Sequence, residues 1–173
     1  NIIFTTTPEF VQASVQAAIA HPEVKILNCS LNTSHRYIRT YYARMYEAKF
    51  LMGAIAGAMA ENGQLAYIAD YPIFGTIANI NAFALGAKMV NPRAQIYLEW
   101  STLKDVDLGI AMDNVIKKGV TVVSGRDMVI PEDASRYFGL YHIEKEGPRN
   151  LAMPLWHWGK FYEQLIRTIM DLS

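Results

Sequence analysis

Short apolar segments alternate with helical patterns along most of this chain, and this alternation limits the folds that the chain can adopt. Six segments have the length and composition of strands. They are Ile2–Thr5, Val24–Asn28, Leu65–Asp70, Gln95–Trp100, Val120–Ser124 and Gly139–Ile143. Helical patterns cover Glu9–Ala20, Tyr41–Glu61, Thr76–Met89, Val106–Lys118 and Trp156–Met170. The alternation predicts an α/β fold in which helices flank mostly parallel sheets.

Two polar stretches interrupt the alternation, and both are long for a connection between a strand and a helix. They are Ser30–Thr40 and Glu144–Ala152. We interpret them as crossovers between two lobes. Residues 1–35 would then end a first lobe, residues 36–150 would form a second α/β lobe, and residues 151–173 would be a return crossover and a helix toward the first lobe.

The charge and cysteine content argue against several classes of function. The 16 basic and 16 acidic side chains cancel without a run of like charge, so the sequence predicts no nucleic-acid partner. The longest apolar stretch, Phe50–Ala60, is far shorter than the roughly 20 residues that span a bilayer. The single Cys29 permits no intrachain disulfide. Because the chain opens on Asn1 without an initiator Met or a signal peptide, we expect a fragment or a processed product.

Motifs for catalysis, phosphate binding and metal binding are missing from the sequence. There is no G-x-S-x-G, G-x-G-x-x-G, G-x-x-x-x-G-K-[ST], H-x-x-x-H or C-x-x-C, and the four histidines are scattered. Neighbouring carboxylates such as Asp105 and Asp107 are better explained as charges at a helix start. The sequence therefore predicts a protein that is not an enzyme and that uses no cofactor and no metal.

The unit from Gly63 to Pro92 is the most informative part for function, because it reads as a strand, a loop and a helix. In open α/β sheets the ligand crevice lies outside the carboxyl ends of the strands. Aromatic and polar side chains at such ends suit a planar polar ligand. The candidate residues are Asp70, Tyr71, Phe74, Trp100, Asp127 and Trp156. Trp100 has an equally good interpretation as closing the sheet edge, and Trp156 as packing the last helix onto its sheet.

The helix predicted over Tyr41–Glu61 has a smooth face, formed by Gly53, Gly57 and the alanines around them. Such a face lets another element approach closely. It predicts tight packing within the domain or, alternatively, a homo-oligomer interface through this helix.

A longer pattern runs through the same region. Its residues are Glu47, Leu51, Gly53, Ala56 and Gly57, then Pro72, and then Phe83, Gly86, Val90, Asn91 and Pro92. In this pattern the chain resembles the basic membrane protein (Bmp) family of ABC-transporter solute-binding proteins. The resemblance extends more loosely upstream and downstream, over nearly the whole chain.

The resemblance implies a type 1 periplasmic-binding-protein fold, here the second lobe with part of the first, and no catalysis. It also implies a purine nucleoside as ligand, an ABC permease as partner, and an extracytoplasmic lipoprotein anchored to the membrane. By position it assigns ligand contacts to Tyr71 or Phe74, to Asp127, and to Trp100 and Ser101. Two positions depart from the family pattern: Gln12 falls near the place of an acid, and Trp156 replaces a lysine.

Two alternatives remain open at this stage. The same fold serves a cytoplasmic ligand-sensing or regulatory module of a larger protein, in which ligand binding biases a conformational equilibrium. An α/β enzyme would require a catalytic constellation from residues outside this chain.

Overall fold

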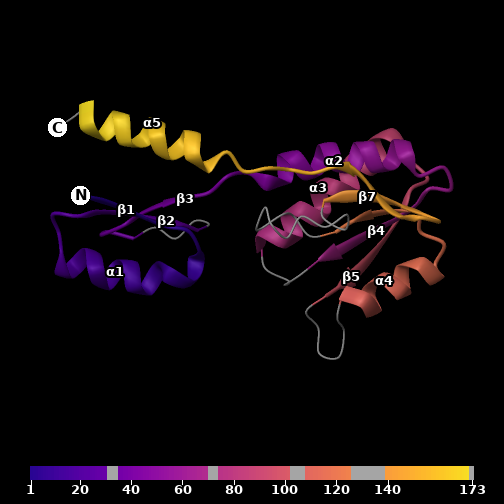
Figure 1. Ribbon diagram of the computed structural model, residues 1–173, viewed down its shortest axis with the longest axis horizontal. Helices are drawn as coiled ribbons and strands as arrows, with labels where there is room; N and C mark the ends of the chain where they lie inside the picture. Colours follow the sequence, from indigo (N-terminus) through magenta and orange to yellow (C-terminus); the bar gives the residue numbers. More distant parts are fainter. Residues whose placement is uncertain (31–34, 70–73, 102–107, 126–138, 172–173) are drawn as a thin grey trace. The chain divides into compact units, whose positions relative to one another are not determined.

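The computed structural model of the protein describes residues 1–30, 35–69, 74–101, 108–125 and 139–171. The chain divides into two compact units, Asn1–Arg44 and Met45–Ser173, and each has its own sheet and its own core (Figure 1). The predicted α/β class is confirmed. The division into lobes at residues 35/36 and 150/151 stays a prediction.

The first unit is a βαβ unit with one further parallel strand. Its elements are β1 (Ile2–Thr5), the 3-10 helix η1 (Pro8–Phe10), α1 (Val11–Ala20), β2 (Lys25–Cys29) and β3 (Arg39–Tyr41). The strands pair in the order β1-β2-β3, and Thr5, Asn28 and Thr40 lie in one row across the sheet. The apolar positions of α1 pack on Ile26 and Ile38. Burial of these side chains stabilises the unit.

The second unit holds a five-stranded sheet with helices on both faces. Its elements are α2 (Met45–Met59), β4 (Gln64–Ala69), α3 (Phe74–Val90), β5 (Gln95–Trp100), α4 (Leu108–Lys117), β6 (Val122–Ser124), β7 (Leu140–Glu144), β8 (Gly147–Ala152) and α5 (Trp158–Asp171). The strand order is β5-β4-β6-β7-β8. Strands β5, β4 and β6 are parallel, whereas β7 and β8 are antiparallel additions at one side.

Successive residues of the central strands point to opposite faces of this sheet, and each face has its own core. Helices α2 and α3 cover the face that carries Tyr67 and Val122. Helix α4 covers the face that carries Ile68 and Val123. Strand β4 is therefore apolar on both faces, as is typical of the centre of a parallel sheet.

Helices α2 and α3 pack so closely that their contact requires glycine. A Cβ atom on Gly53 would lie 2.0 Å from the carbonyl oxygen of Phe83, and one on Gly86 would lie 2.0 Å from that of Phe50. Gly57 faces Ala87 in the same way. The smooth face of α2 is thus used for packing within the unit, which confirms the first of the two interpretations given for it.

The sequence-based prediction was wrong about the segment Glu144–Ala152. It is not a crossover, because it contains a tight turn and strand β8, which pairs with β7. Gly147 and Pro148 weaken the strand pattern, but Gly147 adopts the positive φ of 113° that the turn requires. Pro148 is tolerated because β8 is an edge strand, where a missing N–H is not needed for pairing.

The segment Ser30–Thr40 also differs from its prediction, since its last residues belong to β3. Consequently Tyr41 ends a strand rather than beginning a helix, and α2 starts only at Met45. The prediction of mostly parallel strands holds for both sheets except for β7 and β8.

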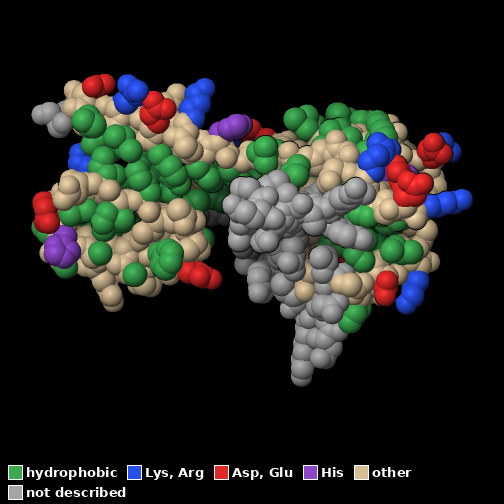
Figure 2. Space-filling view, viewed as in Figure 1, with side chains coloured by type: hydrophobic (Ala, Val, Ile, Leu, Met, Phe, Trp, Pro, Cys, Tyr) green, Lys and Arg blue, Asp and Glu red, His purple; other side chains and the backbone are tan. Residues whose placement is uncertain are grey.

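Within the described segments, every helix is too short or too polar to span a bilayer. Figure 2 shows acidic and basic side chains interspersed over the face in view, in line with the equal numbers of the two kinds.

Candidate functional site

The candidate site lies at the carboxyl ends of the parallel strands of the second unit. Strands β4, β5 and β6 end at Ala69, Trp100 and Ser124, and parallel strands bring these ends to the same edge. Ala69 pairs with Trp100, and Tyr67 pairs with Ser124. This carboxyl edge is where open α/β sheets bind ligands.

Trp100 is the last residue of the edge strand β5. Its half-buried ring packs against the core beneath α2 and α3, together with Ile80 and Ile96. Trp100 is paired in register with Ala69 of β4, and both residues belong to this side of the sheet. This packing supports the edge-closing interpretation of Trp100.

Ser101 fixes the path of the chain as it leaves β5. Its backbone N–H donates to the carbonyl oxygen of Ala69 over 2.8 Å, and its hydroxyl donates to the same oxygen over 3.3 Å. The side chain is buried. The hydroxyl proton of Ser101 is therefore used within the protein.

Lys49 and Ser124 both neighbour Tyr67 of β4, and neither was predicted as a site residue from the sequence. Lys49 is 1% exposed, and its Nζ lies 5.5 Å from the centre of the Tyr67 ring. Ser124 is fully buried, and its hydroxyl has no hydrogen-bond partner among the described residues. The sequence contained one indication that Lys49 is buried. Lys49 lies four residues after Met45 and three before Met52, which places it on the apolar face of the helix.

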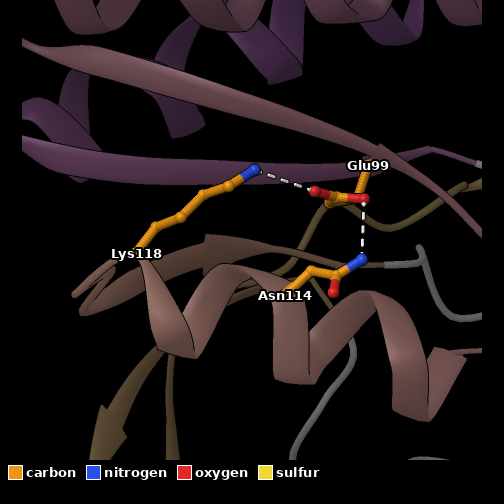
Figure 3. Close-up of polar contacts among 3 residues, drawn as sticks. All are labelled: Glu99, Asn114 and Lys118. Atoms are coloured by element: carbon orange, nitrogen blue, oxygen red, sulfur yellow. Dashed lines mark hydrogen bonds and ion pairs between the residues drawn. The ribbon is translucent and has the colours of Figure 1, made fainter.

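The adjacent acid Glu99 points away from this group. Its carboxylate accepts from Lys118 Nζ over 3.1 Å and from Asn114 Nδ2 over 3.4 Å, as Figure 3 shows. Both partners lie on or just after α4, which covers the opposite face. Glu99 thus fastens α4 to β5 rather than facing a ligand near Trp100.

The structure brings only part of the predicted site together. Asp70, Tyr71 and Asp127 lie outside the described residues, and Phe74 begins α3 with a side chain that is also outside them. Trp100 and Ser101 lie at one edge.

Trp156 lies between β8 and α5. Its ring stacks on Trp158 with a centroid distance of 5.2 Å and an angle of 8° between the planes. Trp158 in turn lies parallel to Tyr162 on α5. The structure therefore gives Trp156 an aromatic neighbour on the final helix.

The first unit has a polar network at its own carboxyl edge. Asn28 Nδ2 donates to Thr5 Oγ1 over 2.7 Å and to the carbonyl oxygen of Thr7 over 2.9 Å, and Thr5 Oγ1 lies 3.1 Å from Ser14 Oγ. These bonds tie the ends of β1 and β2 to the chain that enters α1. Gln12 lies exposed on α1.

A metal site has no support in the described segments, because no three His, Cys, Asp or Glu side chains gather in a way that could hold an ion. A charged cluster lies on the β7–β8 hairpin, where Arg149 donates to Glu144. This hydrogen bond lowers the pKa of the Glu144 carboxyl below its ordinary value. The cluster stabilises the hairpin and lies away from the carboxyl edge.

Comparison with known proteins agrees with this architecture. Two curated relatives are similar over essentially the whole chain. A protein of Haloferax volcanii named "Putative ABC transporter glucose-binding protein" is 25% identical over 183 aligned positions, which cover 100% of this chain and 47% of the relative. A purine-binding protein of Brucella abortus is 26% identical over 184 positions, which cover 99% of this chain and 52% of the relative.

The chain thus spans about half the length of these relatives. The family model described as "ABC transporter substrate-binding protein PnrA-like" matches residues 1–131, well over half of the chain. The chain belongs to the Bmp family of ABC transporter substrate-binding proteins.

Proposed function

We propose that the protein is the non-catalytic solute-binding component of an ABC transporter and that its ligand is a purine nucleoside or a similar planar polar molecule. One observation carries the proposal: an indole and two serine hydroxyls, from Trp100, Ser101 and Ser124, lie at the carboxyl edge of the parallel strands. A ring offers a stacking surface and the hydroxyls offer hydrogen bonds, which together suit a heterocycle with polar substituents.

In this proposal the ligand lies between two lobes that close on it. Residues 1–35 belong to the first lobe, residues 36–150 form the second, and residues 151–173 return to the first. The contacts come from Asp70, Tyr71, Phe74, Trp100, Ser101, Asp127 and Trp156. An ABC permease receives the ligand, and the protein acts outside the cytoplasm as a membrane-anchored lipoprotein.

The relatives support a small polar ligand and define its main competitor. One is named for purine binding and the other for glucose binding. A hexose also stacks on indole, so the choice between the two depends on the polar groups around the ring. The alternative is that the protein is a cytoplasmic ligand-sensing module. Such a module would bind its ligand at the same carboxyl edge and would differ only in its partner.

Self-association is a subsidiary part of the proposal. Because α3 occupies the glycine face of α2, a homo-oligomer through this helix would use its outer face, where Leu51, Ile55 and Met59 are exposed. Light scattering of the full-length protein tests this, since a monomeric mass at high concentration would rule it out.

A thermal-shift screen of the full-length protein against nucleosides, nucleobases, flavins and sugars tests the proposed ligand. A ligand that binds only the folded state raises the melting temperature by mass action. Trp100→Leu should lose this shift. Tyr97→Leu is its matched control, because Tyr97 lies on the same strand and packs on the opposite face. The absence of a shift with every compound would refute the proposal.

A further inference from the structure

Asn62 and Gly63 lie in the turn between α2 and β4, and they are the one place in this sequence where an asparagine precedes a glycine. Asparagine is a thermolabile residue. The backbone nitrogen of the next residue can attack its side-chain amide carbon, and a following glycine hinders this attack least because it has no Cβ atom. Asn62 is also exposed to water. The dipeptide therefore has the chemistry of a spontaneous modification site.

The folded turn engages every group that this reaction needs. The N–H of Gly63, whose nitrogen is the nucleophile, donates to the carbonyl oxygen of Ala60 over 2.9 Å. Asn62 Oδ1 accepts from the backbone N–H of Gln64 over 2.9 Å. Asn62 Nδ2 donates over 2.9 Å to the carbonyl oxygen of Gly119, in the turn that follows α4. The reaction requires the first of these bonds to break, because a base must remove the proton that Gly63 gives to Ala60.

We infer that Asn62 is a deamidation site that the folded turn protects and that reacts when the turn opens. In this reaction the Gly63 nitrogen gives up its proton and bonds to Asn62 Cγ, and the side-chain nitrogen leaves with a proton as ammonia. Water then opens the cyclic imide, and aspartate or isoaspartate remains at position 62. Nothing is oxidised or reduced. Exposed turns open locally at low cost in free energy, so the folded protein reacts slowly.

The product loosens the contact between two turns. A carboxylate accepts but does not donate, so it keeps the bond from the N–H of Gln64 and loses the bond to the carbonyl oxygen of Gly119. The new charge also lies beside Glu61, after the carboxyl end of α2, where negative charge is unfavourable. The turn lies at the amino end of β4, opposite the carboxyl edge, so this inference is independent of the proposed ligand.

The test follows the conversion of Asn62 in the full-length protein at mildly alkaline pH, in a folded sample and in a sample unfolded in concentrated urea. Peptide mass spectrometry measures the fraction converted to aspartate and isoaspartate. We expect conversion to be about tenfold slower in the folded sample, which corresponds to the opening of one or two hydrogen bonds. Asn91 is the internal control and should stay intact in both samples, because the nitrogen of Pro92 has no proton to lose.

The variant Asn62→Asp tests the consequence of the reaction directly. It should lower the melting temperature of the full-length protein by a few degrees. Asn81→Asp is the matched control, since it adds the same charge at an exposed position of α3 and should leave the melting temperature nearly unchanged. Equal rates of conversion in the two samples, an Asn62 that stays intact in urea, or equal melting temperatures for Asn62→Asp and Asn81→Asp would overturn the inference.

Discussion

At the scale of single residues, Gly53 shows how one missing side chain sets the distance between two helices. The carbonyl oxygen of Phe83 lies 2.0 Å from the place of a Cβ atom on Gly53. Gly53→Ala therefore pushes the backbone of α2 away from the backbone of α3. We expect a loss of about 3 kcal/mol in the free energy of unfolding, at the upper end for overpacking. Urea denaturation measures it.

Gly159→Ala is the matched control for this substitution. Gly159 is also helical, and nothing lies within 4 Å of the place of its Cβ atom. Its alanine variant should unfold at the same urea concentration or slightly higher, because alanine favours helix. Equal destabilisation by both substitutions would show that the α2–α3 contact is looser than the structure has it.

Glu144 provides a prediction about pH at the same scale. The hydrogen bond from Arg149 lowers the pKa of the Glu144 carboxyl. The stabilisation from this bond is therefore fully present above the ordinary carboxyl pKa, and it is lost as the pH falls through the lowered pKa. A carboxyl titration followed by NMR should give Glu144 a pKa below 4.5, the ordinary value. In Arg149→Met the pKa should rise. An unchanged titration in that variant would mean that Arg149 is not the cause.

At the scale of elements, Glu99 tests how α4 is held on the edge strand. Its side chain is 17% exposed and has two partners from the α4 region. Glu99→Gln should lower the free energy of unfolding by about 0.5–1 kcal/mol, and high salt should reduce the difference. Glu163→Gln is the control, because its pair with Arg167 is largely exposed on α5 and should change stability by only a few tenths of a kcal/mol, about the value for exposed helix pairs. An equal loss of unfolding free energy in Glu99→Gln and Glu163→Gln would show that Glu99 does not specifically fasten α4 to β5.

The elements also show what the sequence could predict and what it could not. Strands β1 and β5 coincide with their predicted ranges because their apolar residues are bounded by clear breaks. Strand β8 was missed because Gly147 and Pro148 oppose strand formation, and only pairing with β7 overrides them. At the site, Trp100 followed from the position of a strand end, and Ser101 was assigned by the family resemblance. Lys49 was not predicted, because a lysine within an apolar helix is usually read as exposed, and only the helical phase reveals its burial.

At the scale of the whole molecule, the proposed function requires ligand contacts from two lobes, and this gives the broadest prediction. If both lobes close on a nucleoside, the radius of gyration of the full-length protein should fall when the ligand is added, and small-angle X-ray scattering measures this. At a free ligand concentration 100 times the Kd, the folded state should gain about 2.7 kcal/mol. Trp100→Leu should lose both effects, while Tyr97→Leu should keep them. If the ligand binds with measurable heat but the radius of gyration does not fall, lobe closure is not the mechanism. A rigid site would gain the same stability on binding without a change in shape.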